Sequence, residues 1–282
     1  MSLPLCIIVL THNEATNLPR CLRALPDGVE TVVVDSGSSD GTREIAMREG
    51  ARVLEHPFLS FGEQRNWALD SANISQAWVL FLDADEEATP AFWEAVEGLM
   101  KSDHDERVAG VFCCWKMMLR GRWLKRSDSF PKWQLRLLRR GRVRFIDVGH
   151  GQKERRIDGE TTYLTEPYLH HAFSKGWHDW LDKHNRYSTQ EAHARVSAPQ
   201  GSWGLAMQAK GSERNTLLKP LVSKLPFWPV LRFLHGYVWK GGWLEGRAGL
   251  DYAVLMAFYE YLIQLKMSDQ VPEHPSTISN EN

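Results

Sequence analysis

The stretch WVLFLDAD (78–85) joins a run of five apolar residues to two aspartates, Asp83 and Asp85. A short, continuous apolar run is typical of a strand that is buried on both faces, as in a parallel sheet covered by helices. The aspartates follow the apolar run, so we expect them at the carboxyl end of the strand. The stretch therefore predicts an α/β fold with acidic groups at one edge of its sheet.

The residues before this stretch repeat the same alternation of strand and helix. Three more apolar runs are present, and the segments between them carry apolar residues at helical spacing. The predicted strands are LCIIVL (5–10), TVVVD (31–35), ARVLEH (51–56) and WVLFLDAD (78–85). Together they indicate a Rossmann-like, mostly parallel sheet with helices on both faces, in which ligands bind beyond the carboxyl ends of the strands.

The pattern changes after residue 100. Residues 108–119 and 133–145 are predicted to form longer, mixed strands, and residues 174–196 a helix with Ser174 as its N-cap. A Trp- and Leu-rich helical section follows and breaks at Lys240-Gly241-Gly242. The predicted organisation is a main domain over 1–198 with halves 1–100 and 101–198, a linker 199–216, an amphipathic helical extension 217–267 and a disordered tail 268–282.

The composition of the whole chain sets broad limits. The 282 residues carry a formal net charge of −1, so overall charge favours no charged partner. The four cysteines form no CxxC pair and indicate no disulfide framework, which fits a reducing compartment. Residues 5–10 lack the flanks of a signal peptide, and no run reaches the roughly 18 apolar residues of a membrane span. We therefore expect a cytoplasmic protein.

Four polar clusters lie in the first half, three where a predicted strand ends and one on a helix. Because the carboxyl ends of parallel strands meet at one edge of a sheet, these clusters should share one crevice and form a binding site. The clusters are THNE (11–14), DSGSSDGT (35–42), QRN (64–66) and DADE (83–86).

A simpler interpretation of these clusters is helix capping, for which Ser, Thr, Asn and Asp are the preferred residues. Capping does not exclude a ligand, and it leaves Asp35 unexplained. A carboxylate directly after four strand residues is costly unless it is paired or faces a ligand. The N–H of a nucleobase or a ribose hydroxyl would be a suitable partner.

The pair Asp83 and Asp85 carries the sharpest chemical signal. Two carboxylates separated by one residue can reach a common cation, and Mg²⁺ or Mn²⁺ is held in this way together with substrate phosphates. A catalytic dyad that shares a proton is the rival chemistry. No glycine-rich dinucleotide or P-loop motif is present, and no His/Cys cluster has zinc spacing.

The motifs taken together resemble a known family. TxNE, VVVDSGSSDGT, QRN and FLDADE look like the donor half of family 2 inverting glycosyltransferases, which have a GT-A fold. GHGQKE (149–154) and KHNRYSTQEA (183–192) look like the branch that includes lipopolysaccharide-core glucosyltransferases. The resemblance covers residues 3–195. It implies an inverting hexosyltransferase in which residues 1–100 bind a nucleotide sugar, with UDP as the expected nucleotide, and 101–198 bind the acceptor.

The resemblance also implies roles for individual residues. Thr11, Glu14 and Asp35 would contact the base and the ribose. Asp83 would lie near the ribose and the diphosphate, and Asp85 would be the main ligand of Mg²⁺ or Mn²⁺. Further donor-binding candidates in the same motifs are Asn13, Ser38, Asp40, Arg65 and Ala84.

The chain departs from the family pattern at the expected position of the catalytic base. The branch often carries Val-His-Glu, whereas this chain reads VGHGQKE over 148–154. Glu154 is the first choice for the base and Asp147 the second. His150 could bind the donor, orient the base, or be a loop histidine without a special task.

Residues 115–144 form a strongly basic run. They contain eleven Lys or Arg and one acid, Asp128, which gives a local net charge of +10. This bias predicts a polyanionic partner, either a phosphorylated lipid-linked sugar or an anionic lipid surface. Arg136 in the run, and Arg186 in the later motif, are candidates for contact with phosphate or acceptor. Three interleaved tryptophans could stack on sugar rings or pack in the core, namely Trp115, Trp123 and Trp133.

Residues 217–266 are aromatic and basic, with a net charge of +3. Such helices can lie in a membrane interface, so we predict peripheral contact with the inner face of the cytoplasmic membrane. A lid over the catalytic domain or a dimer interface is the alternative.

Two other classes of function fit the sequence less well. A nucleotidyltransferase would be expected to carry a Gly- and Arg/Lys-rich phosphate loop after the first strand, and THNE (11–14) does not supply one. A nucleic-acid-binding protein could use the basic run, but it leaves the four polar clusters unexplained. We therefore expect an inverting glycosyltransferase that acts on an envelope glycolipid such as lipopolysaccharide core, without a nucleic-acid partner.

Overall fold

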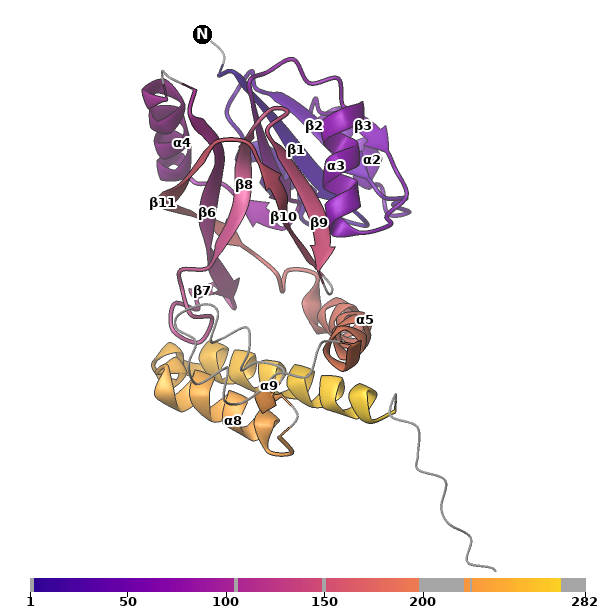
Figure 1. Ribbon diagram of the computed structural model, residues 1–282, viewed down its shortest axis with the longest axis vertical. Coiled ribbons are helices and arrows are strands. Elements are labelled where there is room, and N and C mark those ends of the chain that lie inside the picture. The colour runs from indigo at the N-terminus through magenta and orange to yellow at the C-terminus, as the bar shows by residue number, and fades with distance from the viewer. Residues whose placement is uncertain (1–2, 104–105, 149–150, 198–220, 224, 270–282) are drawn as a thin grey trace, which may run out of the picture. The chain divides into compact units, whose positions relative to one another are not determined.

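The computed structural model describes residues 3–103, 106–148, 151–197, 221–223 and 225–269 (Figure 1). It divides into two compact units, Met1–Trp180 and Leu181–Asn282, which we describe separately. The predicted linker 199–216 and most of the tail 268–282 lie outside the described residues, so the predicted boundaries between domains stay predictions. None of the described helices is both long enough and apolar enough to span a bilayer.

The first unit is built on one large sheet with the strand order β3-β2-β1-β4-β8-β6-β11-β5, and β7 pairs with β6. Four neighbouring strands at one side are parallel: β3 (Arg52–Glu55), β2 (Glu30–Asp35), β1 (Leu5–Thr11) and β4 (Trp78–Asp83). The parallel sheet that the alternation of strands and helices predicted is therefore confirmed for this half.

The other half of the sheet is mixed. It contains β5 (Glu86–Glu87), β6 (Val108–Leu119), β7 (Arg122–Trp123), β8 (Trp133–Arg139) and β11 (Glu160–His170). β8 is antiparallel to both β4 and β6, β11 is parallel to β6, and β5 is antiparallel to β11. β11 was not predicted from the sequence. It lies between the predicted strand 133–145 and the predicted helix 174–196.

The predicted single strand over 133–145 is wrong. The segment turns at Gly141, whose φ of +81° is a left-handed conformation that glycine adopts without strain. Its second part becomes β9 (Val143–Val148), which pairs with β10 (Gly151–Ile157) in a separate two-stranded ribbon. The start of the predicted helix at Ser174 is also wrong, since α5 (Gly176–Ser197) begins at Gly176, after a turn.

Side chains along a strand alternate between the two faces of the sheet. Because the parallel strands are apolar on both faces, helices cover both. Leu5, Ile7 and Val9 of β1 pack with α1 (Leu18–Arg23), α2 (Thr42–Arg48) and α4 (Pro90–Ser102). Cys6 and Ile8 face the opposite side, where α3 (Phe61–Ser71) and β9 cover the sheet. The apolar runs that predicted buried strands are thus the core of the unit.

The second unit contains the rest of α5, then α8 (Trp228–Leu234), the π-helical turn η1 (His235–Trp239), η2 (Gly242–Glu245) and α9 (Gly246–Ser268). Glu260 of α9 accepts hydrogen bonds from Arg195 of α5 at 2.8 Å and from the indole of Trp228 at 3.0 Å. The predicted break at Lys240-Gly241-Gly242 is confirmed, and Gly241 has a φ of +75° there.

Candidate active site

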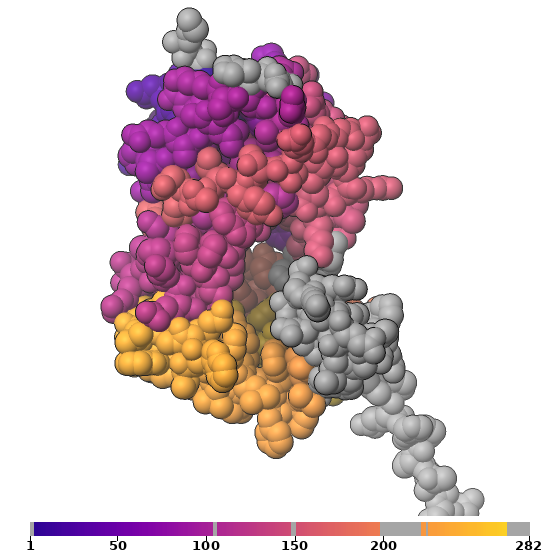
Figure 2. All heavy atoms as spheres, turned by 60° about the vertical axis from the view of Figure 1, so that its left-hand side comes forward, coloured from indigo at the N-terminus to yellow at the C-terminus, as the bar shows by residue number. Residues whose placement is uncertain are grey.

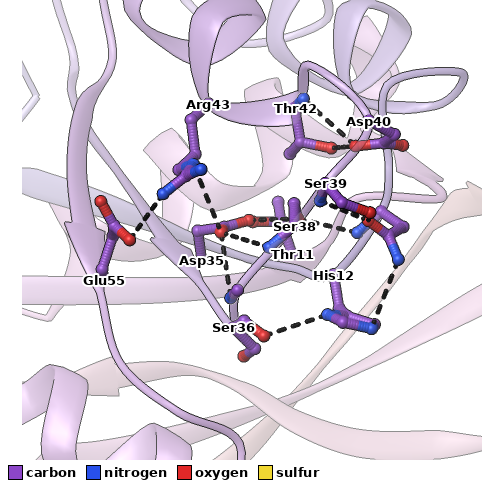
Figure 3. A network of polar contacts seen from close by, with 12 residues as sticks. Thr11, His12, Asp35, Ser36, Ser38, Ser39, Asp40, Thr42, Arg43 and Glu55 are labelled. Carbon is purple, nitrogen blue, oxygen red and sulfur yellow. Dashed lines mark hydrogen bonds and ion pairs between the residues drawn. The ribbon is translucent and has the colours of Figure 1, made fainter.

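The ends of β1 and β2 are joined by a network of hydrogen bonds around Asp35 (Figure 3). Asp35 is fully buried. Its carboxylate accepts bonds from the hydroxyls of Thr11 at 2.9 Å and Ser38 at 2.5 Å, and from the backbone N–H groups of Gly37 and Ser38. The buried charge is therefore satisfied within the loop, and Asp35 holds the β2 loop against the end of β1.

A second set of bonds ties the loop after β1 to the start of α2. The backbone N–H of Asn13 donates to Ser38 Oγ at 2.8 Å, and that of Glu14 donates to Thr42 Oγ1 at 2.8 Å. Asp40 accepts from the backbone of Ala15 and from Thr42. The predicted sugar-donor-binding residues of the first two clusters, 11–14 and 35–42, are thus joined by hydrogen bonds. We call this set the platform.

Glu14 connects this platform to the segment after β11. Its carboxylate accepts bonds from Asn17 at 2.7 Å and from Lys175 Nζ at 2.8 Å. Burial raises the pKa of Glu14, the charge of Asp85 adds to that effect, and Lys175 opposes it. Glu14 and Asp85 follow two parallel neighbouring strands, β1 and β4, and so lie at the same edge of the sheet, as the convergence of strand ends predicted.

Asp83 is held by two buried arginines. Its Oδ2 lies 2.8 Å from Arg136 Nη2 and its Oδ1 lies 3.3 Å from Arg65 Nη2. Glu86 completes the cluster, because its Oε1 lies 2.5 Å from Arg136 and its Oε2 accepts a bond from the Asp83 backbone. Arg65, Arg136 and Glu86 are each at most 2% exposed. Although burial opposes its charge, the arginines hold the pKa of Asp83 well below its usual range.

This cluster gives Asp83 and Arg136 roles that the sequence did not predict. The sequence proposed Asp83 as a metal ligand and Arg136 as a contact for phosphate or acceptor. In the structure both Asp83 oxygens face guanidinium groups, and the Arg136 side chain is buried beneath Asp83. Arg136 therefore positions the carboxylate, whereas Asp85 faces a different partner.

The partner of Asp85 is His170, which was not predicted from the sequence. β5 pairs with the end of β11, so that His170 lies opposite Glu86, and the N–H of His171 donates to the Asp85 carbonyl at 2.8 Å. This brings His170 Nε2 to 3.4 Å from Asp85 Oδ2. Burial lowers the pKa of His170, but the charge of Asp85 and those of Glu86 and Asp83 outweigh it and raise the pKa to about 9.

The pair Asp85 and His170 fits a divalent cation that would take the place of the imidazolium proton, since only neutral imidazole ligates a metal. Two neighbouring ligands that lie about 2.1 Å from an octahedral ion are roughly 3 Å apart, close to the separation observed here. The described residues hold no group of three or more His, Cys, Asp or Glu side chains arranged for a metal. An ion at this place would need oxygens from the substrate to complete its shell, as is usual for Mg²⁺.

The two candidate bases differ in what surrounds them. Asp147 of β9 accepts bonds from Ser60 Oγ at 2.6 Å and from the Gly62 N–H at 2.8 Å, so both its oxygens hold the start of α3. A Cβ on Gly62 would lie 2.9 Å from Asp147 Oδ1, and only glycine leaves room for this contact. Glu154 of β10 is half-buried, and its carboxylate has no hydrogen-bond or ion-pair partner within the part of the chain that the structure describes.

The remaining predicted residues are dispersed. Ala84 is buried between the two aspartates, and Arg186 is exposed on α5 in the second unit. His150 lies outside the described residues.

The basic run 115–144 is largely engaged within the protein. Several of its members pair with acids, including Arg139 with Asp103 at 2.5 Å and Arg144 with Asp70 at 2.6 Å. Lys116 and Lys125 lie over the ring of Trp123. Many charges of the run therefore have partners inside the protein, and the polyanionic partner stays a prediction.

Comparison with known proteins places this site in a family. Residues 6–156 match Glycosyl transferase family 2, which covers more than half of the chain. The chain belongs to glycosyl transferase family 2. It is an enzyme, a glycosyltransferase, and the predicted family is confirmed.

Two curated relatives cover this family 2 chain almost completely. The lipopolysaccharide core biosynthesis glycosyltransferase LpsC of Rhizobium meliloti (strain 1021) is 27% identical, over 94% of this chain and 92% of its own length. The uncharacterized glycosyltransferase RP128 of Rickettsia prowazekii (strain Madrid E) is 23% identical, over 97% of this chain and 90% of its own.

A solved structure shows that the fold is also that of the family. The mannosyltransferase PcManGT from Pyrobaculum calidifontis, in complex with GDP-Man and Mn²⁺, superposes with a TM-score of 0.52. It is 18% identical, and the match covers 95% of this chain and 88% of PcManGT. The predicted GT-A fold is thereby confirmed.

Proposed function

We propose that this glycosyltransferase transfers a sugar from a nucleoside-diphosphate sugar to a hydroxyl of an envelope glycolipid, with inversion at the anomeric carbon. The observation that carries the proposal is the set of polar side chains at the carboxyl ends of the parallel strands β1 and β4, where Arg136 and Arg65 hold Asp83 and His170 Nε2 lies 3.4 Å from Asp85 Oδ2. The complex of PcManGT with GDP-Man and Mn²⁺ supports the donor class, and the name of LpsC supports a lipopolysaccharide-core acceptor.

Asp85 and His170 would hold the divalent ion, and Mg²⁺ and Mn²⁺ both suit a site completed by phosphate oxygens. A bound ion would supply charge neutralisation for the departing nucleoside diphosphate. Asp83, fixed by Arg65 and Arg136, stays ionised and can accept a hydrogen bond from the ribose. The platform around Asp35, to which Thr11 is bonded, would present Asn13 and Glu14 to the nucleotide.

Donor binding is tested most directly by thermal unfolding in the presence of nucleotides. We expect UDP, GDP or one of their sugars, together with Mn²⁺, to raise the melting temperature of the full chain. A ligand at 100 times its dissociation constant stabilises the folded state by about 2.7 kcal/mol. The same panel with EDTA in place of Mn²⁺ is the control, and a panel in which no nucleotide stabilises the protein would refute the proposed donor class.

The base is tested by comparing two carboxylates of the β9–β10 ribbon. We propose Glu154, because Asp147 is already engaged at the start of α3. Glu154→Gln should lower kcat by about 10²–10⁴, the usual contribution of a general base, with little change in KM. Asp147→Ala should instead lower the free energy of unfolding by about 1 kcal/mol, as loss of a helix cap does, and largely spare kcat.

The two variants separate all outcomes. A large loss of kcat in a folded Asp147→Ala protein, with Glu154→Gln active, would move the base to Asp147. Full activity in both variants would remove the base from this ribbon.

We propose that the protein works in the cytoplasm, because its nucleotide-sugar donor is supplied there.

A further inference from the structure

The second unit carries a row of exposed apolar side chains on α8 and η1. Phe227 is 71% exposed and Trp239 is 86% exposed. Between them, exposed apolar residues recur three, four, seven and eleven positions after Phe227, which puts them along one side of the helical rod. The members are Val230, Leu231, Leu234 and Val238, and Trp243 and Leu244 of η2 extend the row. We call this set the α8–η2 row.

The row is unusual for a surface that faces water. Single exposed apolar residues are common, but a contiguous group that includes two exposed tryptophans marks a site of interaction. These segments, in orange, lie at the molecular surface in Figure 2. Packing inside the unit uses other residues, since Tyr252, Ala253 and Ile263 of α9 are buried. Among the described residues of the second unit, the row therefore takes no part in the buried core.

The charges beside the row have one sign. Residues 225–247 contain three basic residues, Arg232, Lys240 and Arg247, and one acid, Glu245. Glu245 is only 5% exposed, whereas Lys240 and Arg247 are exposed. The next acid along the chain, Asp251, lies 2.8 Å from Arg247 Nε. A partner that covers the row thus meets apolar and aromatic groups flanked by positive charge.

We propose that the α8–η2 row docks this protein on the surface of an anionic lipid bilayer. Tryptophan side chains favour the boundary between headgroups and acyl chains, and amphipathic helices with a basic border lie there in the plane of the membrane. A symmetric contact with a second copy would place like charges against each other, which disfavours that occupant. The inference stands on the second unit alone and does not depend on the identity of donor or acceptor.

The test is flotation of the full chain with vesicles in a density gradient. Wild-type protein should float with vesicles of phosphatidylcholine and phosphatidylglycerol, and much less with phosphatidylcholine alone. Phe227→Ser with Trp239→Ser should lower the bound fraction at least about tenfold, since each buried aromatic side chain contributes to membrane affinity. Serine suits position 227, which is the N-cap of α8, so helix formation is not penalised.

Leu59→Ser is the matched control, because Leu59 is 72% exposed but lies in the first unit. It should float like the wild type, and Arg232→Glu with Lys240→Glu should bind weakly. Three results would overturn the proposal: no flotation of the wild type with anionic vesicles, equal loss in Leu59→Ser, or a dimer in light scattering that only the Phe227 and Trp239 substitutions dissolve.

Discussion

Replacing Asp85 with asparagine is expected to lower kcat/KM by about 10²–10⁴ while the protein stays folded. A metal ion contributes several kcal/mol to the stabilisation of charge in a transition state, and each 1.36 kcal/mol corresponds to a factor of ten in rate. Asp85 and His170, 3.4 Å apart, are the side chains that we propose as ligands of such an ion. The measurement is sugar transfer or donor hydrolysis at several Mn²⁺ concentrations, with circular dichroism to verify folding.

Glu87→Gln is the matched control for this experiment. Glu87 lies two residues further along the chain, and its carboxylate pairs with His171 at 2.9 Å rather than with His170. We expect its kcat/KM to stay within about threefold of the wild type, since its partners lie outside the proposed metal site. An Asp85→Asn protein with full activity and an unchanged need for Mn²⁺ would show that the metal ligands are elsewhere.

Replacing Arg136 with methionine is expected to lower the free energy of unfolding by about 3–5 kcal/mol, because it leaves the buried Glu86 without its arginine and Asp83 with Arg65 alone. Arg136 is 2% exposed and contacts both Asp83 and Glu86. The urea midpoint of the variant measures the loss. Combining Arg136→Met with Glu86→Gln should restore part of it, because one uncompensated charge is then removed.

A surface pair provides the comparison. Arg23 lies 3.3 Å from Glu49 and its side chain is 68% exposed. Exposed ion pairs contribute about 0–1 kcal/mol, so Arg23→Met should shift the midpoint little. Equal effects of the two substitutions would mean that the Arg136 cluster does not stabilise the fold.

The donor half of the protein could be predicted because its signals are local. The runs that form β1, β2 and β4 are buried on both faces, and the polar residues that follow each run must meet at one edge of a parallel sheet. The prediction that the residues after β1, β2 and β4 lie at one edge of the sheet needed no knowledge of distant contacts.

The rest of the site could not be predicted because it depends on pairs far apart in the chain. Arg136 reaches Asp83 from 53 positions away, and Lys175 reaches Glu14 from 161 positions away. His170 becomes a partner of Asp85 only because the two-residue strand β5 pairs with β11. The internal ion pairs of the basic run could not be predicted for the same reason, since partners such as Asp70 and Asp103 lie outside it.

The contact between Asp147 and the start of α3 has a consequence for changing the acceptor preference of this enzyme. The β9–β10 ribbon carries the proposed base, and Asp147 anchors it to Ser60 and Gly62 of the helix that also carries Arg65. A β9–β10 ribbon taken from another family member would lose this anchor unless Ser60 and Gly62 were replaced together with it. The β9–β10 ribbon and α3 should therefore be exchanged together. Substitutions in the ribbon that are meant to alter the acceptor should also change the affinity for the donor.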